Sequence, residues 1–439
     1  MNKGVVAILV ILALIVLITP GIVGRMAEKS VEQNLERADS ETPEISVTSQ
    51  KFDRGWFSSE GQHRVEIKDP DMRAEVIDAI GDHYDGELPA VVIDTHLDHG
   101  IIPVSSMSRE KGSLAPGLGS AISTLSLEMP DGEIVRIPGT IYSSIGLTGN
   151  MDNNLVLEAG SFGSAGTTAS WGATDITVTS SPSNSVVGFD GVIESIRVNS
   201  AEDDVEFSGL SFSGNQRPTR YGIATGDMKL EIQSISATPA AGPAVSFGPF
   251  VVDGRTDLVD DRIDLETKAS FAGLQAPGMG EIGVDLDFAI TDVDPAAMAA
   301  VADALDQLGP EDEDPQVMLA AAEEPLKDLL ASGMQFDLRQ LDIALPQGKI
   351  ATRLSATVQE TDRDNFAWSS LMLATEGSAD VSIPKEVMDF VIAMNPQAGM
   401  AVGMGFLRLN GDIYELEAEY KKGLLTVNGA PMPVPLPGR

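Results

Sequence analysis

The sequence predicts a β-rich protein of the α+β class, in which a few helices pack on a long, curved antiparallel meander sheet behind one N-terminal transmembrane helix. Two observations predict the sheet. Apolar and polar residues alternate with a period of two in many stretches, and 43 glycines among 439 residues supply numerous turns. Strands with one apolar face and one solvent-exposed polar face are typical of antiparallel sheets. A third observation, a long uncharged aliphatic run at the N-terminus, predicts the membrane helix.

The composition is strongly acidic. The chain has 66 acidic and 29 basic residues, which gives a net charge of −37. Because phosphate recognition needs clustered lysine and arginine, this charge excludes nucleic acid as a partner and opposes binding to an anionic bilayer surface. Cysteine is absent, which excludes disulfides, thiolate metal sites and cysteine nucleophiles.

Residues 1–24 form the predicted transmembrane signal anchor. The run from Gly4 to Gly24 is uncharged, and a spanning helix needs about 20 apolar residues. A cleaved signal peptide is the alternative, but its apolar region is shorter and it ends in an A-x-A-like site, which the residues after Pro20 do not provide. A very short leader precedes the span, so we expect a cytoplasmic N-terminus and a translocated body.

Residues 25–42 are mostly polar and predict a stalk that continues the membrane helix. After Pro43 the period changes to two, and residues 43–439 are expected to form one β-rich region. Apolar residues alternate with polar ones most clearly in five stretches, whose apolar members are Val65 and Ile67; Met228, Leu230 and Ile232; Val284, Leu286, Phe288 and Ile290; Leu354, Ala356 and Val358; and Tyr414, Leu416, Ala418 and Tyr420.

An acidic helical insertion is predicted at residues 291–333. Asp294 is a suitable cap for a helix whose first residue is Pro295, and a second helical stretch runs from 315 to 332 with an interruption at Pro325. The four consecutive acidic residues at 311–314 suggest calcium, but they lack the spacing of an EF-hand loop, so we expect no specific ion site there.

A third helix is expected at 384–394. Val387, Phe390, Val391 and Met394 recur at helical spacing. This pattern favours packing against the sheet over a ligand-binding role.

The search for catalytic, cofactor and metal sites is negative. Gly278 to Gly283 match G-x-G-x-x-G, but an alternating strand follows them where a dinucleotide site needs a helix. His96 and His99 lie three apart at the end of an expected strand, so their side chains point to opposite faces and a shared metal is disfavoured. The sequence therefore predicts a protein that is not an enzyme and has no cofactor.

The stretch from Arg54 to Ser59 is rich in informative residues. Read as a strand, it places Arg54, Trp56 and Ser58 on one face and Gly55, Phe57 and Ser59 on the other. Trp56 and Phe57 would then be buried on both sides. We interpret the stretch as a structural corner that fixes the first strand, with a recognition edge as the alternative.

Several motifs together resemble the YdgA-like family of bacterial membrane-anchored proteins (DUF945). They are the short N-terminal membrane segment, Arg54-Gly55-Trp56-Phe57-Ser58, His99-Gly100 and the C-terminal residues Tyr414, Asn428 and Gly429, which look like that family's closing hairpin. The resemblance implies a Gram-negative inner-membrane protein with its bulk in the periplasm and no assigned reaction. We interpret these motif residues as structural.

Two functions of different classes remain open. In the first, an apolar face of the sheet binds a lipid or another amphiphile. In the second, the protein is a non-enzymatic scaffold of the cell envelope, and its acidic helical insertion binds protein partners. An apolar sheet face left open by the helices favours the first function, and a sealed face favours the second.

Overall fold

The computed structural model describes most of the chain after the predicted stalk. The described residues are 45–54, 58–70, 73, 88–99, 117–129, 132–164, 167–181, 186–200, 203–239, 244–276, 280–306, 315–363 and 366–432. The predicted anchor at 1–24 and stalk at 25–42 lie outside them, as do residues 55–57 and Gly100. Within the described ranges, no helix has the length and apolarity needed to span a membrane.

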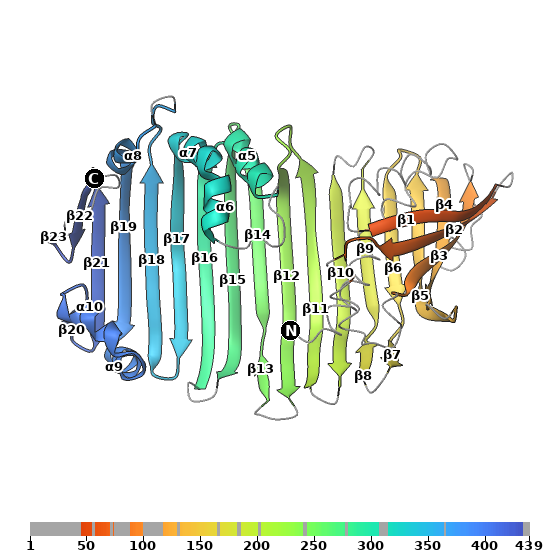
Figure 1. Cartoon of the computed structure of the whole chain (residues 1–439), viewed down its shortest axis with the longest axis horizontal. Helices are drawn as coiled ribbons and strands as arrows, with labels where there is room; N and C mark the ends of the chain where they lie inside the picture. Colours follow the sequence, from red (N-terminus) through yellow and green to blue (C-terminus); the bar gives the residue numbers. More distant parts are fainter. Residues whose placement is uncertain are drawn as a thin grey trace. The chain divides into compact units, whose positions relative to one another are not determined.

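The chain divides into two compact units. Unit 1 comprises Met1–Asn215 and Glu231–Val245, and unit 2 comprises Gln216–Leu230 and Ser246–Arg439. Large open antiparallel sheet and short helices dominate the described residues (Figure 1). The predicted β-rich antiparallel class is therefore confirmed.

Unit 1 is an antiparallel meander with one hairpin inserted into it. Its strands pair in the order β1-β2-β3-β4-β5-β6-β9-β10, and the β7–β8 hairpin joins the end of β10 through β8. The bounds are β1 Ile45–Arg54, β2 Ser58–Ile67, β3 Ala90–His99, β4 Gly117–Glu128, β5 Ile134–Gly146, β6 Met151–Leu157, β7 Gly160–Ser164, β8 Thr167–Trp171, β9 Thr174–Ser180 and β10 Val187–Asn199.

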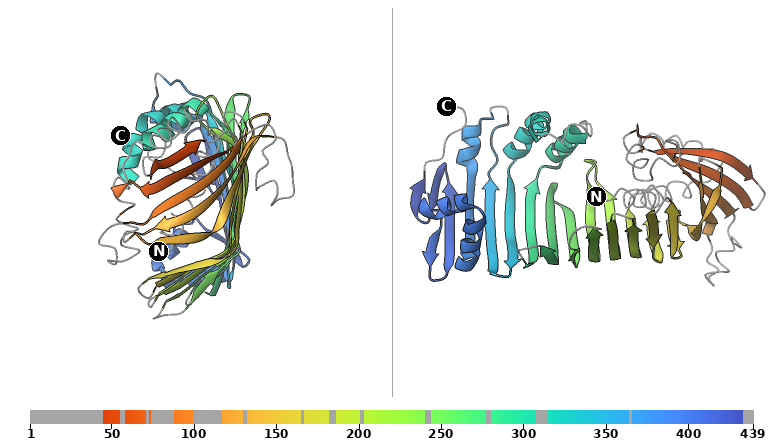
Figure 2. Two further views of the ribbon diagram at one scale, coloured as in Figure 1. Left: turned by 90° about the vertical axis from the view of Figure 1, so that its right-hand side faces the viewer. Right: turned by 60° about the horizontal axis from the view of Figure 1, so that its bottom comes forward.

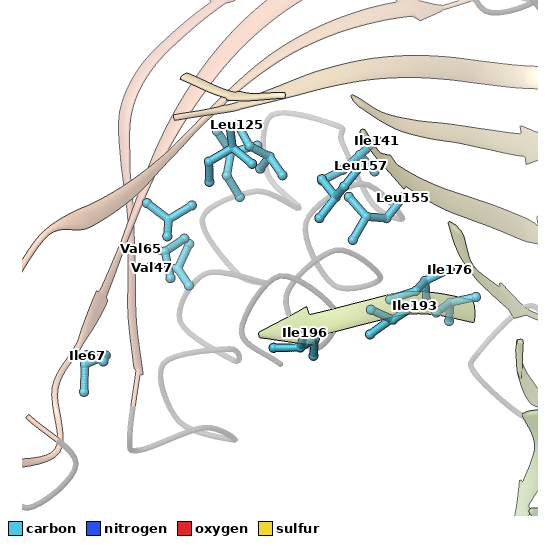
Figure 3. Close-up of a cluster of buried hydrophobic side chains, with 14 residues drawn as sticks. Val47, Val65, Ile67, Leu125, Ile141, Leu155, Leu157, Ile176, Ile193 and Ile196 are labelled. Atoms are coloured by element: carbon cyan, nitrogen blue, oxygen red, sulfur yellow. The ribbon is translucent and has the colours of Figure 1, made fainter. Parts of the chain in front are cut away.

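The apolar side chains on one face of the unit 1 sheet are buried. Alternate residues of β2, such as Val65 and Ile67, are buried, while their neighbours Arg64 and Glu66 are half-buried. Aliphatic side chains from eight strands point into a shared interior (Figure 3). The members of this cluster are Val47, Val65, Ile67, Val91, Ile93, Leu125, Ile137, Ile141, Leu155, Leu157, Ile176, Val178, Ile193 and Ile196.

Unit 2 contains a second antiparallel meander. Its strands pair in the order β14-β15-β16-β17-β18-β19-β21-β22-β23, and β20 also pairs with β21. The bounds are β14 Phe250–Val259, β15 Arg262–Ala276, β16 Gly280–Val293, β17 Met334–Leu345, β18 Gly348–Val358, β19 Thr375–Pro384, β20 Arg408–Asn410, β21 Ile413–Lys421, β22 Leu424–Val427 and β23 Ala430–Met432. Three further strands, β11 Asp203–Pro218, β12 Ala224–Pro239 and β13 Val245–Phe247, come between β10 and β14 in the sequence.

Helices lie on one face of the unit 2 sheet, at both ends of its strands (Figures 1 and 2). One group follows β16, and the other follows β19. The first group is α5 Pro295–Asp306, α6 Pro315–Ala321 and α7 Glu323–Ala331, and the second is α9 Lys385–Met394, η3 Pro396–Ala398 and α10 Gly399–Gly403, while α8 Trp368–Ala374 precedes β19.

The start of the first helical group confirms the expected cap. Asp294 Oδ1 accepts hydrogen bonds from the backbone N–H groups of Ala296 and Ala297, at 2.9 and 3.1 Å, and Pro295 is the first helical residue. The expected interruption at Pro325 is wrong. The break falls at Ala322, because a proline in the first turn of a helix removes only an N–H that has no intrahelical partner.

Two other expectations need correction. Arg54 to Ser59 do not form one strand, because β1 ends at Arg54, β2 begins at Ser58, and Arg54 pairs with Ser59. The two ends of the stretch therefore belong to two paired antiparallel strands, and the sheet begins before the stretch, at Ile45. In α9, Val387 is buried as expected, but Met394, the last residue of the helix, is 64% exposed.

Candidate functional site

The central feature of unit 2 is a continuous apolar surface on one side of its sheet. Directly opposite residues in an antiparallel pair share a face, so the registers align the alternating residues of β16 with those of β15 and β17. We call this surface the unit 2 apolar face; its central residues are Leu265, Thr267, Ala269 and Phe271 in β15, Val284, Leu286, Phe288 and Ile290 in β16, and Phe336, Leu338, Leu341 and Ile343 in β17.

The surface continues across the next strands. Leu338 of β17 lies opposite Leu354 of β18, which lies opposite Ala379 of β19. Phe288 and Phe336 stack with their ring centroids 6.4 Å apart. Among the described positions that the registers align on this face in β15 to β18, none carries a charged side chain.

The unit 2 apolar face is only partly covered. Its central side chains are half-buried, and Leu354 is 36% exposed. In unit 1 the equivalent inward side chains are buried. An antiparallel sheet normally packs its apolar face into a core, so a half-exposed apolar face of this extent is typical of an interaction or ligand-binding surface.

The opposite face of the same strands is charged. Arg339 Nη2 lies 2.8 Å from Glu266 Oε1, and Lys268 Nζ lies 3.4 Å from Asp287 Oδ2. Lys349 donates a hydrogen bond to Asp342 at 2.8 Å, and this hydrogen bond lowers the pKa of the Asp342 carboxyl. The sheet of unit 2 therefore has one ionic face that water can solvate and one face without charge.

Both helical groups leave the middle of the apolar face uncovered. At one end, Met388 of α9 packs with Leu407 and Tyr414 in a small buried cluster. At the other end, Ile263 and Val293 are buried where β15 and β16 meet the first helical group. The helices therefore border the half-exposed centre of the face.

Ion pairs hold the first helical group at its end of the sheet. Asp294, which caps α5, also accepts a hydrogen bond from Arg363 at 2.7 Å. Burial opposes ionisation of Asp294, but the hydrogen bonds from Arg363, Ala297 and Ala296 outweigh it, and the pKa of this carboxyl is lowered. Arg262 of β15 donates to the carbonyl oxygen of Ser332, just after α7, at 2.6 Å.

The sequence indicated only part of this surface. It identified the apolar alternation of β16 and β18 but missed β15 and β17. In β17 an extra residue between Leu338 and Leu341 interrupts the alternation, and a search that allowed it would have found this strand. In β15 the spacing is regular, but Thr267 and Ala269 at two of the inward positions weaken the apolar signal.

The structure places the N-terminal motif residues in unit 1. Arg54 ends β1 and Ser58 begins β2, so they flank the first hairpin. His99 ends β3, opposite Gly119. The side chain of His96 is exposed and lies 3.4 Å from Asp98, and no group of metal-ligating side chains is present within the part of the chain that the structure describes.

The C-terminal motif residues lie in unit 2, where Tyr414 belongs to the buried cluster with Met388 and Asn428 and Gly429 form the last turn. Asn428 and Gly429 have φ values of 49° and 77° and form the two-residue turn between β22 and β23, as in a type I′ hairpin. Asn428 accepts a hydrogen bond from the N–H of Glu417 at 2.9 Å and donates to the carbonyl oxygen of Phe406 at 3.0 Å. These contacts give Asn428 an architectural role and place it away from the centre of the apolar face.

Comparison with known proteins identifies a family. The family described as bacterial protein of unknown function (DUF945) matches residues 1–435. No curated protein and no solved structure matches the chain. Because the match covers nearly all of the sequence, the chain belongs to DUF945, the family that its motifs resemble.

Proposed function

We propose that this protein binds a lipid or another amphiphile along the unit 2 apolar face. The observation that carries the proposal is the contrast between the two faces of one sheet. One face carries cross-strand ion pairs, and the other is uncharged, half-exposed and bordered by helices at its ends.

Hydrophobic burial supplies the driving force for such binding. Each square ångström of apolar surface removed from water contributes about 25 cal/mol, and an acyl chain lying across the Phe288 and Phe336 rings would remove water from both partners. The neighbouring Leu354 is the most exposed of the large apolar residues at the centre of this face. A polar side chain at this position would oppose the binding of hydrocarbon.

The test measures how much fluorescent fatty acid the delipidated full-length chain retains when it is held in an amphipathic polymer. Empty polymer is the blank. We expect saturable binding by the wild-type chain and about tenfold weaker binding by Leu354→Asn, because an amide placed against hydrocarbon loses its hydrogen bonds to water. Thr357→Asn is the matched control, since Thr357 is exposed on the ionic face of the same strand.

Two outcomes would end this proposal. The first is a wild-type chain that retains no more fatty acid than empty polymer. The second is an equal loss of binding in Leu354→Asn and Thr357→Asn, because a surface lying on one face of the sheet cannot respond equally to changes on both.

The proposal includes a place in the cell and the absence of catalysis. We propose that residues 1–24 anchor the chain in the bacterial inner membrane and that the two units lie in the periplasm. The uncharged run at the N-terminus supports the anchor. A reporter enzyme that is active only outside the cytoplasm is fused after Arg439, and we expect this fusion to be active. If it is inactive while a reporter that works only in the cytoplasm is active at the same position, the chain has the opposite orientation.

A second candidate function is a scaffold for envelope proteins. The observation in its favour is a pair of exposed apolar side chains, Val317 and Met318, on helix α6 of the acidic segment. Crosslinking in cells is expected to recover a reproducible protein partner that Val317→Ser with Met318→Ser releases. Unchanged partners in that double variant would exclude this surface.

A further inference from the structure

The inner face of unit 1 carries a band of uncharged polar side chains. Thr95 lies directly opposite Ser123, and Ser143 lies directly opposite Asn153. His63 is two residues from Gly61, the residue opposite Thr95, so it lies diagonally beside Thr95. These five residues, from β2, β3, β4, β5 and β6, are called the polar band.

The polar band is buried but only partly hydrogen-bonded. Thr95 and Ser123 share a hydrogen bond of 2.8 Å. His63, Ser143 and Asn153 are 0%, 1% and 2% exposed. Both ring nitrogens of His63, Ser143 Oγ and Asn153 Nδ2 have no hydrogen-bond partner among the described residues. Since buried polar groups in proteins are nearly always paired, this cluster indicates a hydrogen-bonding ligand.

The site is shaped to hold a neutral imidazole. A Cβ atom at Gly61 would lie 3.2 Å from His63 Nε2, so the missing side chain leaves room for the ring. Burial lowers the pKa of His63, and the neutral ring offers one donor and one acceptor. With the Ser143 hydroxyl and the Asn153 amide, the polar band can both donate to and accept from a ligand.

The surroundings select against a charged ligand. The described inward positions that the registers align with the band in β2 to β6 carry no aspartate, glutamate, lysine or arginine. A carboxylate or phosphate would therefore be buried without an opposite charge, which is strongly unfavourable. The registers place the buried aliphatic side chains of Ile93, Leu125, Ile141 and Leu155 beside the band, and Figure 3 draws the last three of them.

We propose that unit 1 binds a neutral acylglycerol, whose hydroxyl and ester oxygens bond to the polar band and whose acyl chain packs against the aliphatic cluster. Hydroxyl groups match the acceptors of the band, and ester carbonyl oxygens match its donors. The site is formed by unit 1 residues alone, so this proposal does not depend on the unit 2 apolar face.

The experiment compares two ligands that share one acyl chain, monooleoylglycerol and oleate, at pH 8. Both are titrated into the full-length Leu354→Asn chain in amphipathic polymer, so that binding to the unit 2 apolar face contributes little. If the unit 2 proposal is wrong, this substitution changes nothing and the comparison still holds. We expect monooleoylglycerol to bind more tightly than oleate.

Substitutions in the band sharpen the comparison. In this background, Ser143→Ala and Asn153→Leu are each expected to weaken monooleoylglycerol binding about fivefold, the effect of one hydrogen bond, and to leave oleate binding unchanged. Ser144→Ala is the matched control, because its side chain lies on the opposite face of β5. Thermal unfolding checks that each variant folds, and removal of an unpaired buried group is not expected to lower the midpoint.

Either of two results would overturn the proposal. One is oleate binding as tightly as monooleoylglycerol. The other is unchanged monooleoylglycerol binding in both Ser143→Ala and Asn153→Leu, which would make the polar band an internal layer without a ligand.

Discussion

Asn428 stabilises the last hairpin through its backbone and its side chain. Its φ of 49° lies in the left-handed region, which asparagine and glycine tolerate best. Its amide also connects β21 to the segment after α10, through Glu417, Gly405 and Phe406. The residue therefore joins the closing hairpin to the segment after the second helical group.

Substitution of Asn428 separates these two contributions. Asn428→Ala is expected to destabilise the hairpin by about 1–3 kcal/mol, because it loses the side-chain hydrogen bonds and strains the turn. Asn428→Gly keeps the turn conformation and loses only the hydrogen bonds, so its effect should be smaller. Amide hydrogen exchange in 405–432 measures both; equal exchange in the two variants would show that the backbone conformation contributes nothing.

His63 predicts a pH dependence in unit 1. The residues opposite it are Ser49 in β1 and Ile93 in β3, neither of which offers a charge. Burial lowers the pKa of His63 below its ordinary value of about 6.5. Below about pH 6.5 the unfolded chain therefore binds a proton that the folded chain resists, and the folded state loses stability as the pH falls.

A His63→Leu variant tests this linkage. As the pH falls below 6.5, the wild type should lose stability relative to the variant. The difference in their free energies of unfolding should change by up to about 1.4 kcal/mol per pH unit. Above pH 7.5 it should be constant. Urea unfolding followed at pH 5.5, 6.5 and 7.5 measures the difference, and a pH-independent difference would mean that folding does not shift the pKa of His63.

At the level of single elements, helix α5 depends on one carboxylate. Asp294→Ala removes the cap and the ion pair with Arg363, and we expect a local loss of about 0.5–2 kcal/mol. Asp294→Asn keeps an oxygen that can accept the cap hydrogen bonds but removes the charge, so it measures the contribution of the ion pair alone. Hydrogen exchange of residues 296–300 should be fastest in the alanine variant; equal rates in both variants would assign the whole effect to Arg363.

The elements that the sequence predicted are those with local signals. Asp294 followed by Pro295 marks a helix start without reference to the rest of the chain, and the alternation in β16 and β18 needs only a period of two. Arg54 to Ser59 do not form the single strand that the sequence suggested, because side-chain periodicity alone does not show where one strand ends; only the pairing of Arg54 with Ser59 assigns them to two antiparallel strands. Periodicity predicted which side of the unit 2 sheet is apolar. It could not predict that this side stays partly exposed, because exposure depends on how the helices pack on the sheet.

The polar band shows the same limit at the level of single residues. Thr95, Ser123, Ser143 and Asn153 are ordinary residues in their own strands. Only the registers of β3 to β6 bring them together. A single sequence carries no signal for such a cluster, because the residues are far apart along the chain.

For the whole molecule, net charge is the dominant electrostatic property. The net charge is −37, so acidic side chains repel one another in the folded state and destabilise it. Increasing NaCl from 0.01 to 0.1 M shortens the screening length from about 30 to about 10 Å, so we expect the thermal unfolding midpoint to rise. A fall over this range would show that ion pairs such as Arg339 with Glu266 outweigh the repulsion.

The two units use the same antiparallel architecture in different ways. In unit 1 the apolar face is buried in a cluster of fourteen side chains, whereas in unit 2 the fully buried cluster contains Met388, Leu407 and Tyr414 and the centre of the apolar face stays half-exposed. The half-exposed face of unit 2 gains stability when hydrocarbon covers it, whereas in unit 1 the unpaired groups of the polar band are the part that gains from a ligand.

Photocrosslinking in cells tests this account most directly. A benzophenone amino acid replaces Leu354 on the unit 2 apolar face or Thr357 on the ionic face of the same strand, in the full-length chain. After irradiation, mass spectrometry is predicted to find adducts of lipid mass at position 354 and none at position 357. Absence of lipid adducts at 354, or equal adducts at both positions, would contradict the account.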